Sequence, residues 1–134
     1  MKIIILIAML ANLAFSNTGT DYGNEKEISE RTGIPICAII QSQRLKDDII
    51  SLGKNDKFMH CALSCQIALR CGGYESMSIG ILKELWDLIS PGDADIEDLK
   101  ADAKGIKLVL QRNANNDYEC INKCDEIYPS NLRR

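Results

Sequence analysis

Apolar side chains recur at helical spacing along most of the chain, and no stretch alternates cleanly as a half-buried strand would. Pro35 is suited to a helix start, Gly53 to a helix end and Asn55 to an N-cap. The pattern predicts four helices, at residues 35–52, 56–70, 78–89 and 95–111. A last short helix carries Cys120 and Cys124. We therefore expect an all-α domain, a small bundle of four to five helices.

Two of these helices carry apolar stripes that are predicted to face the core. On the helix at residues 78–89 the stripe consists of Ile79, Leu82, Leu85, Trp86 and Ile89. On the helix at residues 95–111 it consists of Ile96, Leu99, Ala103, Ile106 and Leu110. Acidic side chains lie one position away from stripe residues, so they are expected to flank the core: Glu84, Asp87, Asp98 and Asp102.

The first sixteen residues have the organisation of a secretory signal peptide. Lys2 is followed by an apolar run, and small residues occupy the −3 and −1 positions of a cut after Ser16. An uncleaved anchor or a buried N-terminal helix is the alternative. Residues 17–34 are polar and are predicted to form a flexible tail, which leaves residues 35–134 as the helical domain. We expect a secreted or periplasmic protein.

All six cysteines lie beyond the predicted cut, and an even number in an exported chain favours three disulfides. Cysteines four apart share a helix face, so two such pairs on antiparallel helices can be joined like rungs. Of the fifteen connectivities, this geometry favours Cys61–Cys124, Cys65–Cys120 and Cys37–Cys71. The two rungs would close long loops and contribute about 4 kcal/mol each. A metal held by thiolates would instead need a reducing compartment.

Composition excludes several classes of function. The net charge is −3, or −4 without the signal peptide, which argues against nucleic-acid binding. The one histidine, in a chain without a CxxC pair, excludes zinc fingers and ribbons. No second stretch approaches the length of a membrane span. A protein partner or a component of the cell envelope is therefore the expected contact.

His60, with acidic side chains on other helices, is the candidate site. One imidazole and several carboxylates suit a divalent ion such as Zn, Mn or Mg, which would activate water for hydrolysis. Without a metal, His60 would act as a general base. The candidate catalytic residues are His60, Glu84, Asp87 and Asp98, and the candidate metal ligands are these four with Asp102. The alternative is a structural polar network in which His60 is hydrogen-bonded across the bundle.

One ordered pattern of residues runs through the middle of the chain: Asp56-Lys57-x-x-His60, then Ser64, then Lys83-Glu84-x-x-Asp87, and then Asp98-x-x-Ala101-Asp102-x-x-Gly105. It is similar to a family of small bacterial envelope proteins of unknown function, distantly related to the VanZ-like group. Cys61, Ser64-Cys65 and Cys71-Gly72 resemble a cysteine-bearing version at the C-termini of Rhs-type polymorphic toxin proteins. Asp102 stands where the family pattern has Asn. The resemblance implies supporting roles for Asp56, Lys57, Ser64, Lys83 and Gly105.

Two functions follow as hypotheses. The first is an exported helical module of the binding or effector type, which acts in the cell envelope or outside the cell. The second is a metal-dependent or acid/base hydrolase that uses His60 with Glu84, Asp87 and Asp98. A serine nucleophile is disfavoured, because Ser64 lies near His60 in sequence but nothing marks an oxyanion hole or a nucleophile elbow.

Overall fold

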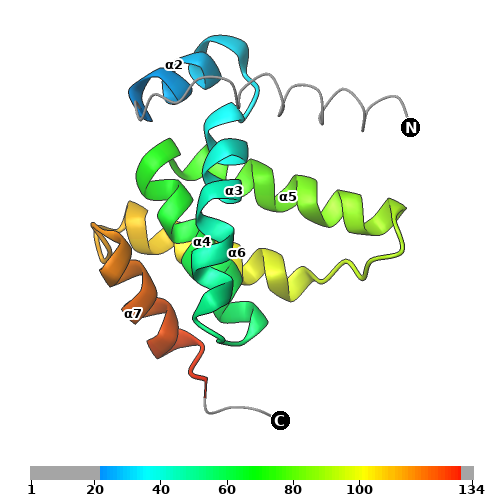
Figure 1. Ribbon diagram of the computed structural model, residues 1–134, viewed down its shortest axis with the longest axis vertical. Coiled ribbons are helices and arrows are strands. Elements are labelled where there is room, and N and C mark those ends of the chain that lie inside the picture. Colours follow the sequence, from blue (N-terminus) through cyan, green and yellow to red (C-terminus); the bar gives the residue numbers. More distant parts are fainter. Residues whose placement is uncertain (1–21, 131–134) are drawn as a thin grey trace.

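The computed structural model describes residues 22–130, which form helices without strands. The predicted signal peptide, residues 1–16, lies outside this part. The all-α prediction is confirmed (Figure 1). The helices are α2 (Tyr22–Thr32), α3 (Ile36–Ser51), α4 (Asp56–Cys71), α5 (Gly73–Ile89), α6 (Ile96–Leu110) and α7 (Asp117–Ile127).

Helix α4 is the centre of the bundle. Its most extensive contact is with α6, and α3, α5 and α7 also pack against it (Figure 1). Phe58 and Ile67 of α4 are almost fully buried, and with the disulfide sulfurs they form much of the apolar core. Helices α5 and α6 form a hairpin beside α4, joined by the loop at residues 90–95.

Helix α2 lies where the sequence predicts no helix, within residues 17–34. Its acidic Glu25 accepts a hydrogen bond from Gln41 of α3 at 2.9 Å and pairs with Arg44 at 3.1 Å. Ser29 of α2 is buried and accepts the backbone N–H of Cys37 at 2.9 Å. The helix is therefore held by polar contacts with α3, which explains why an apolar pattern did not reveal it.

Helix ends follow local capping rules where a side chain is suited to them. Asn55 accepts the N–H of Phe58, and Asp95 and Asn116 cap α6 and α7 in the same manner. Helix α5 begins at Gly73, five residues before the predicted start. Gly72 supplies the positive φ of 92° that separates α4 from α5.

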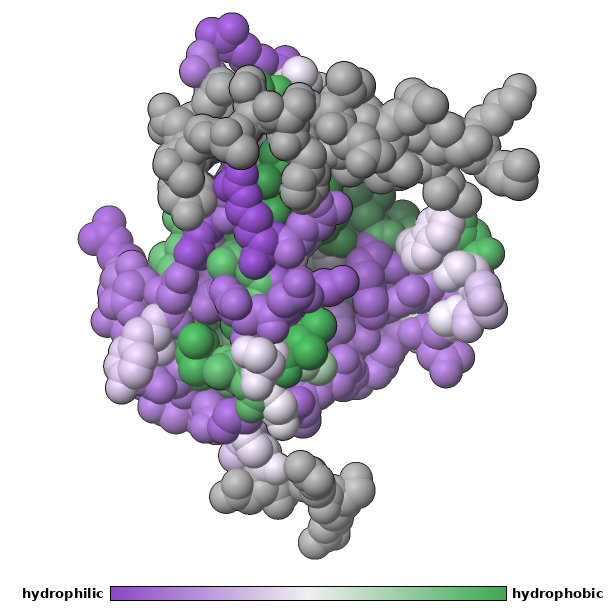
Figure 2. Space-filling view, in the orientation of Figure 1, coloured by the Kyte–Doolittle hydropathy of each residue, from purple (hydrophilic) through white to green (hydrophobic). Residues whose placement is uncertain are grey.

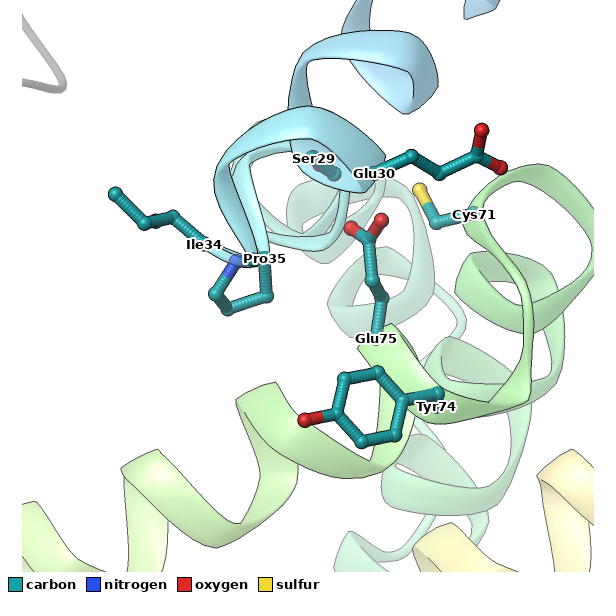
Figure 3. A pocket seen from close by; sticks show the side chains of 8 residues that line it. Ser29, Glu30, Ile34, Pro35, Cys71, Tyr74 and Glu75 are labelled. Atoms are coloured by element: carbon teal, nitrogen blue, oxygen red, sulfur yellow. The ribbon is translucent and has the colours of Figure 1, made fainter.

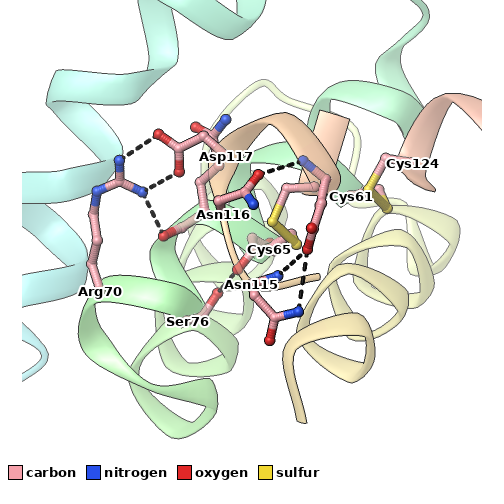
Figure 4. Close-up of a disulfide and its surroundings, with 12 residues drawn as sticks. Cys61, Cys65, Arg70, Ser76, Asn115, Asn116, Asp117 and Cys124 are labelled. Atoms are coloured by element: carbon pink, nitrogen blue, oxygen red, sulfur yellow. Dashed lines mark hydrogen bonds and ion pairs between the residues drawn. A yellow bond between two sulfur atoms is a disulfide. The ribbon is translucent and has the colours of Figure 1, made fainter. Parts of the chain in front are cut away.

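The structure joins the same three cysteine pairs that the spacing favours. Cys61–Cys124 and Cys65–Cys120 connect α4 to α7, as Figure 4 shows. Beside them Arg70 of α4 donates two hydrogen bonds to Asp117 at the start of α7, at 2.8 and 2.7 Å. All six cysteines are paired.

The apolar stripes of α5 and α6 largely face outward, so the prediction that they form the core is wrong. Leu85 and Ile89 are 53% and 79% exposed, and Ile96 and Leu110 of the other stripe are also exposed. The buried faces carry small and acidic residues: Ser76, Gly80 and Glu84 on α5, and Asp98, Ala101, Asp102 and Gly105 on α6. Of the predicted α6 stripe, only Ile106 is buried. Hydrophobic side chains are visible at the surface in the region of α5 at the right of Figure 2.

Gly105 explains how closely α6 approaches α4. A Cβ atom at this position would stand 2.1 Å from the carbonyl oxygen of Cys61 and 3.0 Å from the amide nitrogen of Cys65. Both are backbone atoms of a helix that two disulfides hold, so they cannot move aside. Only glycine fits there.

We predict that Gly105→Ala lowers the free energy of unfolding by about 1–3 kcal/mol, the usual cost of overpacking. The loss should appear although alanine is the better helix former. Urea unfolding measures it. Gly73→Ala is the matched control, because its Cβ would meet only the side chains of Ile106 and Leu110, which can rotate. A Gly105→Ala variant as stable as the wild type would contradict this close contact.

Candidate functional site

His60 lies between two aspartates of α6, one on each side of its ring. Its Nδ1 atom is 3.1 Å from Oδ1 of Asp102, and its Nε2 atom is 3.3 Å from Oδ2 of Asp98. Both aspartates are buried, at 4% and 3% exposure for Asp98 and Asp102. Their spacing of four residues places them on one face of α6, the face turned toward α4. The structure therefore brings together three of the predicted site residues.

Two lysines share the carboxylate of Asp98 with His60. Lys57 of α4 donates a hydrogen bond to Asp98 and another to Asp95, the N-cap of α6. Lys83 of α5 approaches the other oxygen of Asp98 at 3.4 Å. Asp98 is thus the point where α4, α5 and α6 meet electrostatically.

Glu84 and Asp87, two of the predicted catalytic residues, contact Lys83 and not His60. Lys83 is 3.0 Å from Glu84 and 2.9 Å from Asp87. Glu84 is buried, and its second oxygen accepts the backbone N–H of Asp95 at 2.8 Å. Glu84 therefore ties α5 to the end of the loop that leads into α6, while Asp87 pairs with Lys83 on its own helix.

The surroundings of His60 favour its protonated form. Burial lowers the pKa of His60, but the hydrogen bond and charge of Asp102, with the charges of Asp98 and Asp56, outweigh it and raise the pKa above 6.5. Burial raises the pKa of Asp98, because it disfavours the charged carboxylate, but Lys57 and His60 lower it by more. The pKa of Asp98 is therefore below the usual aspartate value. Lys57 and Lys83 also have pKa values above the ordinary lysine value.

This geometry does not resemble a serine nucleophile with its base. Ser64 lies one turn after His60 on α4, but its hydroxyl donates to Oδ1 of Asp102 at 2.7 Å. His60 and Ser64 therefore share one acceptor, and the ring nitrogens of His60 both face carboxylates. The arrangement orients an imidazolium and stabilises its charge.

At the exposed side of this cluster, three potential ligand atoms lie close enough together to hold one metal ion. One ligand atom each of Asp56, His60 and Asp98 lie within 4.8 Å of one another, and Asp56 is exposed. Three of the predicted metal ligands are not part of this group. Asp102 lies at the other ring nitrogen of His60, and Glu84 and Asp87 contact Lys83. An ion here would have to compete with Lys57, which contacts both Asp56 and Asp98.

A cavity of about 290 Å³ lies elsewhere, where α2, the turn into α3 and the start of α5 meet (Figure 3). Buried Glu75 points toward it and accepts the N–H of Ala38 at 3.1 Å. Helix α3 lacks a side-chain cap of its own, so Glu75 and Ser29 satisfy its first N–H groups. Sequence reasoning missed both residues, because a cap supplied by another helix leaves no local signal.

Comparison with known proteins gives no relative: no protein-family model, no curated protein and no solved structure matches the chain. Within residues 22–130, no helix has the length and apolar character needed to cross a membrane.

We predict that stability falls as pH rises through the pKa of His60. Because this pKa is higher in the folded than in the unfolded chain, the protonated ring contributes fully below about pH 6.5 and loses that contribution above its folded pKa. Urea unfolding between about pH 6 and pH 9, with a chelator present, measures the decline.

His60→Gln is the control for this pH dependence. His60 is the only histidine, and the α-amino group is common to both proteins, so the variant should lose most of the decline. An equal decline in both proteins would show that His60 is not the titrating group. Absence of any decline in the wild type would show that its charge adds nothing to stability.

Proposed function

We propose that the chain is an exported, disulfide-stapled binding module, which contacts a partner through the outer face of α5. The observation that carries the proposal is the contrast between two neighbouring residues. Glu84 is 6% exposed and Leu85 is 53% exposed. A soluble helix normally buries its leucines and exposes its glutamates, and the reversal here indicates that the apolar side of α5 serves a contact.

The outer face of α5 is a continuous apolar surface. It consists of Ile81, Leu82, Leu85, Trp86, Leu88 and Ile89, all exposed, and Ile96 follows just beyond the loop. Contiguous apolar patches of this kind mark interaction sites in soluble proteins. The charged side chains of α5 lie elsewhere: Lys83 pairs with Glu84, Asp87 and Asp98, and buried Glu75 accepts the N–H of Ala38 of α3.

Export is supported by the cysteines. Three disulfides with no thiol left over are compatible with an oxidising compartment, the periplasm or the exterior of the cell. The resemblance to bacterial envelope proteins and to domains of Rhs-type toxin proteins agrees with this setting and stays a prediction.

The binding role predicts that α5 accepts a foreign amphipathic helix. Trp86 is the only tryptophan and is 44% exposed at the edge of the face, so its emission reports binding. A tryptophan-free synthetic helix with a leucine face should shift this emission to shorter wavelength, with saturation, because it excludes water from the indole. Leu85→Glu should weaken the binding about tenfold or more.

Leu52→Glu is the matched control, since Leu52 is exposed to a similar extent but lies at the end of α3. It should bind the helix as the wild type does. The proposed binding role fails if, at concentrations where the wild type is monomeric, no saturable shift occurs, or if Leu85→Glu and Leu52→Glu bind equally well.

A second candidate function, metal-dependent or acid/base hydrolysis at His60, is favoured by one observation. The ligand atoms of Asp56, His60 and Asp98 lie close enough together for one ion. An imidazole and two carboxylates suit Zn²⁺ or Mn²⁺, and a bound ion would lower the pKa of a coordinated water. Lys57 competes for the same carboxylates, so the binding role takes first place.

For this candidate, we expect ZnCl₂ or MnCl₂ to raise the melting temperature in a saturable manner, because an ion that binds only the folded state stabilises it. Asp56→Asn should abolish the rise while it leaves the contacts of His60 with Asp98 and Asp102 in place. Lys54→Asn, a change at a nearby charged residue outside the cluster, is the control. Hydrolysis through a metal is excluded if neither ion changes the melting temperature.

A further inference from the structure

We propose that the outer face of α5 binds a second copy of this chain, by pairing α5 with α5. The inference rests on the proposed binding role of this face and names its partner. It draws on three properties of the face: the spacing of its residues, its size, and its lack of unpaired charge.

The spacing selects a helix as the partner. Tyr74, Ser78, Ile81, Leu85 and Leu88 follow one another at intervals of four, three, four and three residues. This is the a/d spacing of a coiled-coil seam, in which one helix inserts side chains between those of another. The seam points away from the bundle, since Tyr74 is 83% and Leu88 is 69% exposed. Exposed Leu82 and Ile89 widen it on one side.

The size matches that of a dimer interface. The exposed fractions of the six α5 residues from Ile81 to Ile89 amount to apolar surface on the order of 600–700 Å², at or above the upper limit of the 300–600 Å² of the largest patch on a typical monomer. A standard interface buries about 800 Å² on each partner. One α5 face and its rim therefore supply what a stable dimer needs.

The distribution of charge favours a second copy. A two-fold axis brings equivalent surfaces together, so an unpaired charge on the seam would meet its own copy. The seam itself has none. The acidic residues beside it are buried and already bonded: Glu75 to the N–H of Ala38, and Glu84 to Lys83 and the N–H of Asp95.

A lipid surface fits this face less well. Helices that lie in a membrane interface carry several Lys or Arg residues on their polar side. Helix α5 carries one, Lys83, and it is paired with Glu84, Asp87 and Asp98. The chain as a whole is acidic, with a formal charge of −3.

Sedimentation velocity on the full chain, exported through an oxidising compartment and purified as it accumulates there, tests the proposal. We expect a concentration-dependent dimer. Leu85→Glu should weaken it about 100-fold or more, because it places two like charges in a dry seam. Leu52→Glu should leave it unchanged. Since Leu85 is exposed, circular dichroism should be the same in all three proteins, and so should the melting temperature at concentrations where all three are monomeric.

The decisive experiment places opposite charges at position 85 of the two copies. Leu85→Lys alone should also be monomeric, whereas an equal mixture of Leu85→Glu and Leu85→Lys should restore a dimer of one copy of each. A dimer that Leu85→Glu does not weaken overturns the proposal, and so does a mixture that stays monomeric. A wild type that is monomeric at its highest soluble concentration, yet binds the synthetic helix through Leu85, overturns the self-pairing and leaves the binding role standing. If it does neither, both fail.

Discussion

The ion pairs around Asp98 hold three helices to one another. Lys57 of α4, Lys83 of α5 and His60 all approach this one buried carboxylate. A buried carboxylate is costly unless it is paired, and removal of one partner from such a group typically costs about 3–5 kcal/mol. The polar sides of α5 and α6 can face inward only because these cations meet them. The apolar side of α5 is then left to the surface, so its exposed apolar face and the buried charges are two results of one arrangement.

The same arrangement gives His60 a clear physical role. Six carboxylates stand around two lysines and one imidazole in this cluster: Asp56, Glu84, Asp87, Asp95, Asp98 and Asp102. The excess of negative charge keeps the ring protonated to higher pH. Asp102 orients the ring from one side and Ser64 holds Asp102 in turn. Protonated His60 thus acts, beside Lys57, as a second cation between α4 and α6.

Much of the fold can be predicted from the sequence, but the orientation of the α5–α6 hairpin cannot. Helix periodicity located α3, α4 and α6 to within one residue and α5 with a start five residues too late, and the CxxxC spacing indicated how α4 and α7 are joined. The apolar stripe of α5 was assigned to the core because hydrophobic burial is the usual rule. Here charge pairing between helices prevails, and pairing across a bundle has no local signature. One signal was present: Ser76, Gly80, Glu84 and Asp87 recur at helical spacing and mark the face that packs closely.

The candidate site was predicted in part. The helical faces correctly brought His60 together with Asp98 and Asp102, since residues four apart on α6 must share a side. They did not show that Glu84 and Asp87 would form ion pairs with Lys83 and would not contact His60. Long flexible side chains choose their partners only once the backbones are placed. Helix α2 escaped notice for a related reason, because its contacts through Glu25 and Ser29 are polar.

The attachment of α7 has a consequence for the order in which the chain folds. The two buried residues of this helix are cysteines bonded to α4, and they are joined by the packing of Ile121 and the ion pair of Asp117 with Arg70. Helices α4 to α6 carry the ion pairs around Asp98 and the contact at Gly105, and none of these involves α7. The central helices can therefore assemble while Cys61 and Cys65 are still reduced. The bonds Cys61–Cys124 and Cys65–Cys120 then fix the last helix to α4, and without them Cys61 and Cys65 would be two thiols on the side of α4 that faces α7.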